Sequence, residues 1–260
     1  MIIISSKTCK KLYLILTISL LSFLPNSFAV SKTPPPSNAE HSLTHSKQTP
    51  ITPFKVSYTL KKGGIPVAEV TRELKKSTTG TYLFQSESKP IGVATFFIKD
   101  VILERSIWQP VEGNFRPEEY SYERTGGKKD RHVKLIFNWE TNKVTNIINN
   151  DAWHMNIPGN VQDKLLYQLS IMYDLDKQDK KLNYEVADGG RLKDYSFEVL
   201  SNETIPTKVG QIETIKIRRQ VKNRTITIWC APKYNYLPVQ IEQNDKDGEF
   251  ELYINTITGF

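Results

Sequence analysis

The residues best suited to chemistry lie near the middle of the chain, in DAWHMNIPGNVQDKLLYQL (residues 151–169). This stretch combines His154 with Asp163 across a Pro-Gly break, and a histidine and a carboxylate can serve as general base and acid. Asp163, however, follows Asn160 by three residues, where a carboxylate caps the free amides at a helix N-terminus. We therefore expect Asp163 to cap a helix and His154 to be a packed or surface residue.

Other nucleophilic or metal-dependent chemistry finds little support in the sequence. A serine hydrolase needs a base and an orienting acid, but the region expected to fold holds only His132 and His154, and it has no G-x-S-x-G motif. Two isolated histidines and one cysteine lack the spacing of zinc ligands, so no metal or cofactor is predicted. Cys230 is in phase with Ile226 and Ile228, which predicts a buried structural thiol.

Paired carboxylates leave a third function open, because a glycosidase needs only two acids. The acids considered for this role are Glu118, Glu119, Asp100, Glu104 and Asp188. The sequence places no two of them across a cleft, and acids in turns and on outward strand faces are the ordinary case.

Two groups of side chains favour binding over catalysis. Basic residues gather around two hairpins, where they form either an anion-binding rim or a guard for exposed strand edges: Arg124, Lys128, Arg131, Arg218 and Arg224. Aromatic and apolar residues either line a site for an apolar ligand or pack the core, which is the more common role: Trp108, Tyr122, Trp153, Leu165, Leu169 and Trp229.

The elements that must position these side chains are short strands. From Phe54 onward, apolar and polar residues alternate, which is typical of a half-buried strand. The pattern recurs along the chain between turn signals such as KKGG, TGGKK and NDKDG. About ten to twelve strands are counted in this way. They predict an all-β fold, a strongly curved antiparallel sheet forming a partly open or closed barrel.

One segment, residues 161–174, departs from this period. Val161, Leu165, Leu169 and Met172 recur there at helical spacing. We predict a single α-helix that buries this face against the sheet or in its mouth.

The N-terminal region predicts export. A segment with three lysines precedes an apolar run and small residues that end at Ala29, which predicts a signal peptide over residues 1–29, with an uncleaved anchor as the alternative. Residues 30–53 are rich in Ser, Thr and Pro and are interpreted as a disordered tether. A single β-rich domain is then expected over residues 54–260, without a transmembrane segment after cleavage.

Processing also changes the charge and the cysteine content. It removes three lysines and no acids, which lowers the formal net charge from +7 to +4. This mild charge argues against nucleic acid as a partner, but lipid head groups or another envelope polyanion remain candidates. Cys230 is then the single cysteine, so an intrachain disulfide is excluded.

The order of several motifs is similar to that of a known family. They are FKVSYTL, KDVILERS, FRPEEYSY, HVKLIFNW, IPGNVQDKLLYQL, YEVADGG, TKVGQIETIKIRR, WCAPKYNYLPVQIE and FELYINTITG. Together, over roughly residues 54–258, they resemble a family of exported proteobacterial proteins catalogued as a domain of unknown function, number three-one-zero-eight. The resemblance implies a β-rich domain in the periplasm of a Gram-negative bacterium and brings no established activity. The expected architecture is also similar to lipoprotein-carrier folds, an analogy that does not fix function.

These observations favour a non-enzymatic protein of the cell envelope. The first hypothesis is that it binds an apolar or amphiphilic ligand, such as a lipid, in the concave face of the sheet. The second is a structural or assembly factor that acts on an envelope protein partner through its surface and has a filled core. An open apolar pocket of several hundred Å³ would separate the two, and a hydrolase with paired carboxylates is the third.

Overall fold

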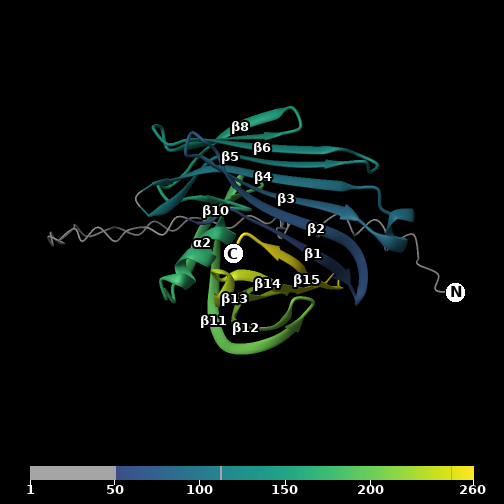
Figure 1. Ribbon diagram of the computed structural model, residues 1–260. Helices are drawn as coiled ribbons and strands as arrows, with labels where there is room; N and C mark the ends of the chain where they lie inside the picture. The colour runs from purple at the N-terminus through teal and green to yellow at the C-terminus, as the bar shows by residue number, and fades with distance from the viewer. Residues whose placement is uncertain (1–50, 112, 247) are drawn as a thin grey trace, which may run out of the picture.

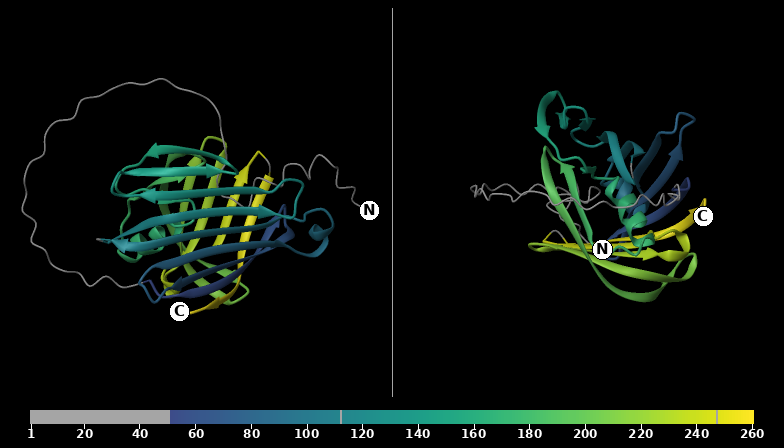
Figure 2. Two further views of the ribbon diagram at one scale, coloured as in Figure 1. Left: turned by 90° about the horizontal axis from the view of Figure 1, so that it is seen from above. Right: turned by 90° about the vertical axis from the view of Figure 1, so that its left-hand side faces the viewer.

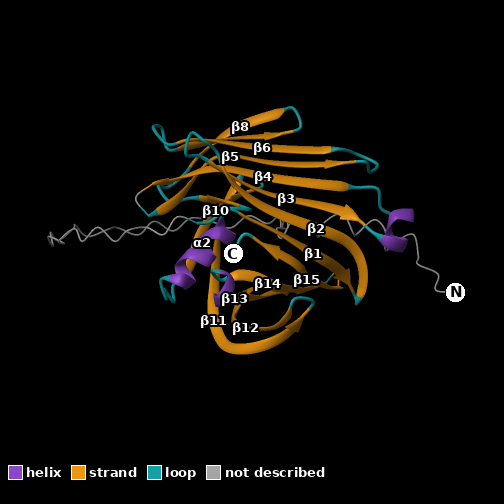
Figure 3. Cartoon of the chain, viewed as in Figure 1, coloured by secondary structure: helices purple, strands orange, loops and turns teal. Residues whose placement is uncertain are grey.

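The computed structural model describes residues 51–260 except 112 and 247, so the expected signal peptide and nearly all of the expected tether lie outside the described residues. Within these residues, strands dominate and helices are few (Figures 1 and 3). The first half of the chain forms β1 (Phe54–Lys62), β2 (Ile65–Lys76), β3 (Tyr82–Pro90), η2 (Gly92–Phe96), β4 (Val101–Val111), β5 (Asn114–Thr125), β6 (Arg131–Asn138), β7 (Lys143–Ile148) and β8 (Asp151–Asn156). The second half forms β9 (Gln162–Asp163), α2 (Tyr167–Asp176), β10 (Leu182–Asp188), β11 (Arg191–Thr207), β12 (Gly210–Val221), β13 (Arg224–Ala231), η3 (Pro232–Tyr234), β14 (Leu237–Asp245) and β15 (Gly248–Thr258).

Fifteen strands of the described region form one sheet in the order β8-β7-β6-β5-β4-β3-β2-β1-β15-β14-β13-β12-β11-β10-β9. The chain starts at the centre of the sheet and builds outward to β8. It then crosses to the far edge and returns from β10 to β15, which pairs with β1. All pairs are antiparallel except the short β9–β10 pair. The expected curved antiparallel fold is therefore confirmed, with more strands than the turn signals predicted.

The sheet is not closed by hydrogen bonds between its two edges, but it curls until they approach. Seen end-on in Figure 2 (right), the strands curve around α2. Trp153 of edge strand β8 lies against Gly190 in the β10–β11 turn, where an added Cβ would meet its ring at 2.3 Å. The side-chain Nε2 of Gln162, in β9, donates a hydrogen bond to the Phe115 carbonyl of β5 (2.9 Å). The result is a barrel that remains partly open.

The crossing segment differs from the predicted helix of residues 161–174. Helix α2 begins only at Tyr167, because Gln162 and Asp163 pair with Val186 and Ala187 of β10. The predicted apolar face is nevertheless buried, with exposed fractions no higher than 4% for Val161, Leu165, Leu169 and Met172. Most of the helix surface is covered, which fits an element enclosed by a sheet rather than laid on its surface.

The interior follows the alternation of the strands. Phe54, Val56, Tyr58 and Leu60 of β1 all point inward, as the period of two predicts. Cys230 is also buried, as expected, and burial raises the pKa of its thiol. None of the helices in the described part of the chain is long and apolar enough to cross a bilayer.

Candidate functional site

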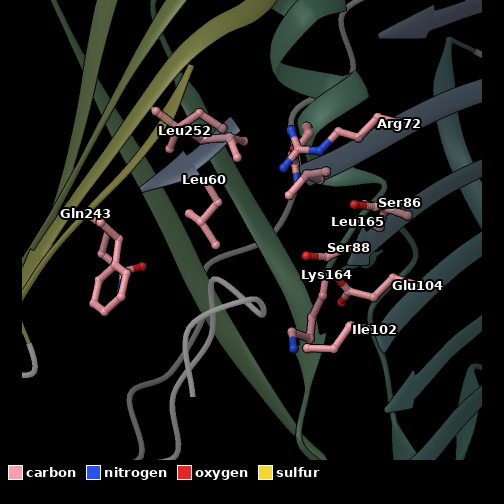
Figure 4. Close-up of a pocket in the computed structure, with 14 residues that line it drawn as sticks. Leu60, Arg72, Ser86, Ser88, Ile102, Glu104, Lys164, Leu165, Gln243 and Leu252 are labelled. Atoms are coloured by element: carbon pink, nitrogen blue, oxygen red, sulfur yellow. The ribbon is translucent and has the colours of Figure 1, made fainter. Parts of the chain in front are cut away.

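A cavity lies inside the barrel where the crossing segment meets both halves of the sheet (Figure 4). Its volume is about 60 Å³, within about 730 Å³ of space free of protein atoms that includes open solvent at the mouth. The apolar lining residues are Leu60, Val70, Ile102, Leu165, Ile241, Phe250 and Leu252. The polar ones are Arg72, Ser86, Ser88, Glu104, Lys164, Gln168 and Gln243. The wall is therefore amphiphilic, with apolar side chains concentrated on β1, β14 and β15 and polar ones on β2–β4 and the crossing segment.

The polar part of the wall contains buried atoms without a hydrogen-bond partner in the part of the chain that the structure describes. Arg72 Nε, Ser88 Oγ, Gln168 Oε1 and Gln243 Oε1 are buried and form no hydrogen bond among the described residues. Each residue is at most 7% exposed. An unpartnered buried polar atom costs about 1–3 kcal/mol, so four around one cavity indicate that water or a ligand satisfies them there.

Glu104 is the one carboxylate among the described residues that line this cavity. The Tyr120 hydroxyl donates a hydrogen bond of 2.5 Å to Glu104 Oε1. Burial raises the pKa of Glu104, and the nearby Lys164 ammonium, the Tyr120 hydrogen bond and Arg72 oppose this rise. The cavity thus presents two cations and one acid that can take up a proton more readily than an exposed glutamate.

Asp163 lies next to this wall but does not line the cavity. Its carboxylate accepts hydrogen bonds from the amides of Leu165 and Leu166 (both 2.8 Å) and from the Ser106 hydroxyl (2.5 Å). Burial raises its pKa to about 6, against the lowering effect of these bonds. The prediction of an acid at the third helical position was wrong, because Asp163 precedes the helix. It instead holds the turn that leads into α2 and ties that turn to β4.

Lys164 connects the cavity with the far half of the sheet. Its ammonium lies 3.8 Å from Asp188 Oδ1 at the end of β10, and its side chain is 12% exposed. Asp188 also pairs with Lys193 (2.6 Å) and accepts a hydrogen bond from the Tyr195 hydroxyl (3.3 Å). A polar network therefore runs from the cavity wall to the edge of the sheet.

The six residues predicted to line an apolar site do not come together. Leu165 lines the cavity, whereas Leu169 is fully buried beside it. Trp108 stacks on Tyr82 in the core, with ring centroids 4.5 Å apart. The remaining three lie elsewhere: Tyr122 faces the Lys164 ammonium, Trp153 is 36% exposed on β8, and Trp229 donates to Glu203 under Lys216.

The five predicted rim residues are also divided in their roles. Three arginines form ion pairs with carboxylates: Arg124 with Asp100 (3.5 Å), Arg218 with Glu198 (3.1 Å) and Arg224 with Asp245 (3.3 Å). Lys128 is exposed and Arg131 half-buried. These two remain without an ion pair to any described residue.

His154 is on the surface of β8, where its Nδ1 lies 3.1 Å from the Thr145 hydroxyl. It is therefore a surface residue, one of the two roles expected for it. No group of three His, Cys, Asp or Glu side chains able to hold a metal ion occurs within residues 51–260 as described.

A second hollow, of about 460 Å³, lies on the outer face of β4–β7. It contains Glu119, Glu123 and His132. Each carboxylate is already bound to a cation on a neighbouring strand, Glu119 to Lys134 (2.8 Å) and Glu123 to Arg105 (3.1 Å). This groove is a set of paired surface charges, and it does not offer the facing pair of acids that a glycosidase needs.

Arg72 was not among the residues predicted to form a site, although its position in the sequence pattern marks it as unusual. It occupies an inward position between Val70 and Leu74, and Glu104 does the same between Ile102 and Ser106. A charged residue on the apolar face of an alternating strand needs a buried partner or a ligand. The inward positions of Arg72 and Glu104 can be read from the sequence, but the sequence does not show which charged side chains lie close together.

The fold and the site define a β-barrel-like domain with an internal amphiphilic cavity. The chain belongs to the family described as protein of unknown function (DUF3108), whose model matches residues 53–255. A β-barrel-like protein of the domain of unknown function DUF1849 from Brucella abortus has a similar fold (TM-score 0.52, 10% identity, 81% of this chain and 98% of that chain covered). A candidate lipoprotein from Parabacteroides distasonis is a weaker structural match (TM-score 0.32, 10% identity, 80% and 95% covered). No curated protein matches the chain significantly.

Proposed function

We propose that this protein binds an amphiphile in the cell envelope, most simply in the periplasm of a Gram-negative bacterium, and holds the polar end of that molecule in the cavity. The observation that carries the proposal is the gathering of four unpartnered buried polar atoms around one amphiphilic cavity. The basic and apolar N-terminal segment of the sequence supports export.

The unpartnered atoms indicate the chemistry of the head group. Arg72 Nε needs an acceptor, the amide oxygens of Gln168 and Gln243 need donors, and the Ser88 hydroxyl serves either role. A head group with hydroxyl donors and phosphate or carbonyl acceptors meets all of these needs. The first carbons of an attached chain would lie against the wall formed by Leu60 and its apolar neighbours.

The size of the cavity limits what enters it. About 60 Å³ is room for a few water molecules, well below the roughly 300–1,000 Å³ of ordinary ligand sites. Only a head group fits, so the chain of the amphiphile must extend through the mouth or displace the wall. The small volume is also the observation that favours the second candidate, a surface-acting assembly factor with a filled core.

Native mass spectrometry of protein purified from its own envelope separates these candidates. The first predicts a bound organic mass that is lost in Ser88→Val and Arg72→Met, which change the cavity wall. Ser57→Val, on the outward face of β1, is the matched control and keeps the bound mass. Protein that carries no organic ligand, with a normal melting temperature, would contradict the proposal and favour the assembly factor.

A further inference from the structure

The connection between β3 and β4 exposes apolar side chains at one end of the barrel. Phe96, Val93 and Phe97 are 79%, 61% and 59% exposed, which makes them the most exposed large apolar residues of the described chain. Figure 1 shows this connection, η2, projecting beyond the strand ends. We call Val93, Phe96 and Phe97 the apolar tip.

The exposure of the apolar tip is built into an ordered backbone. The Ile91 amide donates to the Val67 carbonyl (3.1 Å), and the amides of Phe97 and Ile98 both donate to the Ala94 carbonyl (3.0 and 2.8 Å). Ala94 is the buried residue of η2. The turn is therefore anchored by its small residue while its large apolar side chains face outward. A concentrated apolar surface of this kind marks an interaction site.

Exposed lysines lie beside the apolar tip. The β5–β6 turn packs against the end of the η2 connection, since a Cβ at Gly126 would lie 2.5 Å from the Lys99 carbonyl oxygen. Lys99, Lys128 and Lys129 are exposed and form no ion pair with any described residue. We call these three the basic collar. Asp130 is the exposed acid of the same turn, so the collar keeps a positive balance.

The geometry points to an anionic lipid bilayer as the partner of this surface. A bilayer needs only a projecting apolar tip that enters the acyl boundary and cations that remain among the head groups. Lysine stems are suited to this arrangement, because they cover apolar surface while their ammonium groups stay in water. A folded protein partner or a second copy of the chain would instead need a pocket shaped to receive two phenylalanines.

The cavity lies toward the same end of the barrel as the apolar tip. Its lining includes Leu60, Ser88 and Ile102, which stand two residues from the end of β1, two from the end of β3 and second in β4. These strand ends adjoin the β1–β2 turn and η2 (Figure 1), and the lining extends from there to Gln168 in the first turn of α2. Docking through the tip therefore brings the membrane surface to the end of the barrel where these strand ends line the cavity.

Vesicle co-sedimentation tests the inference. The probes are large vesicles of phosphatidylcholine alone and of phosphatidylcholine with about a quarter phosphatidylglycerol, an anionic lipid that attracts lysines. Residues 1–50 are identical in all variants, so differences report on the fold. We expect the paired change Val93→Ser and Phe96→Ser to weaken binding at least tenfold. Val209→Ser, an exposed apolar position in the β11–β12 turn, is the matched control and should bind as the unaltered protein does.

Charge variants test the basic collar. Each of Lys99→Gln, Lys128→Gln and Lys129→Gln should weaken binding to the anionic vesicles about fivefold, the equivalent of about 1 kcal/mol per lysine. Raised salt should have the same effect, and Lys208→Gln in the β11–β12 turn is the control. Equal binding by the tip variant and the Val209 variant would overturn the inference. So would concentration-dependent self-association that the tip variant abolishes while vesicles bind no protein. The outcome is separable from the proposed function, because the tip variant should keep any mass bound in the cavity.

Discussion

Asp163 and Lys164 are consecutive residues that border two regions with opposite hydrogen bonding. The Asp163 carboxylate is fully buried and accepts three hydrogen bonds within the protein. Lys164 lines a cavity where four buried polar atoms have no hydrogen-bond partner among the described residues. The hydrogen bonds to Asp163 hold the crossing segment in place, whereas the four polar atoms around the cavity form no hydrogen bond among the described residues that could stabilise the fold. The contrast teaches that the two sites should respond differently to the same kind of substitution.

The largest effect is expected at the satisfied site. Asp163→Ala leaves the Ser106 hydroxyl and two backbone amides without an acceptor, and should lower the free energy of unfolding by about 2–4 kcal/mol. Asp163→Asn keeps an oxygen for the amides and should cost about 1 kcal/mol. Urea denaturation followed by circular dichroism measures both. His154→Gln, on the surface of β8, should change stability by less than about 0.5 kcal/mol. Equal losses of unfolding free energy for Asp163→Ala and His154→Gln would contradict the comparison.

The second expected effect is on the pH dependence of stability. Burial raises the pKa of Asp163 from 3.8 to about 6 on folding, so between these values the folded state binds the proton that the unfolded chain has lost. The free energy of unfolding therefore falls as the pH rises through this window, by up to about 3 kcal/mol. Glu104, whose pKa burial also raises, adds to the fall. Stability curves across this pH range should be flatter for Asp163→Asn; an unchanged slope would refute the assignment.

Glu104 combines features of the two regions. It lines the cavity, and its carboxylate also accepts a hydrogen bond from the Tyr120 hydroxyl. Tyr120→Phe removes that donor and should lower the free energy of unfolding by about 1–2 kcal/mol. Tyr122→Phe is the control on the same strand, because its hydroxyl has no hydrogen bond to a described residue. Thermal melting of the two variants measures the difference, and identical melting temperatures would show that the bond contributes nothing.

The smallest effect is expected at two buried serines on adjacent strands. Ser106 donates a hydrogen bond to Asp163, whereas the Ser88 hydroxyl has no partner within the described residues. Ser106→Ala should cost about 1 kcal/mol, and Ser88→Ala should change stability by less than about 0.5 kcal/mol or raise it slightly. Chemical denaturation of both variants in parallel is the measurement. A larger loss at Ser88 would mean that its hydroxyl is satisfied in solution by a tightly held water.

The strands were predictable from the sequence because their signal is local. The alternation from Phe54 to Leu60 gives both the strand and its inward face. The start of α2 was not predictable, since Gln162 and Asp163 are held by Val186 and Ala187, more than twenty residues away. Helical spacing identified the buried face correctly but could not reveal that its first residues bind a distant strand.

The cavity depends still more on distant contacts. The inward positions of Arg72 and Glu104 follow from the strand period. Their common site with Lys164 exists only because the crossing segment enters the barrel, which no local pattern encodes. The aromatic candidates show the same limit. Trp108 packs on Tyr82 in the core, whereas Trp229 donates to Glu203 and lies under the Lys216 ammonium. Both follow the strand alternation, so the alternation alone does not distinguish these environments.

The pairing of β1 with β15 joins the first and last strands of the described chain at the centre of the sheet. Lys55 lies opposite Thr258, and the Thr258 hydroxyl donates to the Lys55 carbonyl across 203 positions of sequence. Such non-local pairing slows folding, and here it delays completion until the last strand has been synthesised. Until then the unpaired edges of β1 and β14 are templates for aggregation. A chain that ended before Gly248 would lack β15, which pairs with both β1 and β14. The two halves of the sheet would then have no strand that joins them.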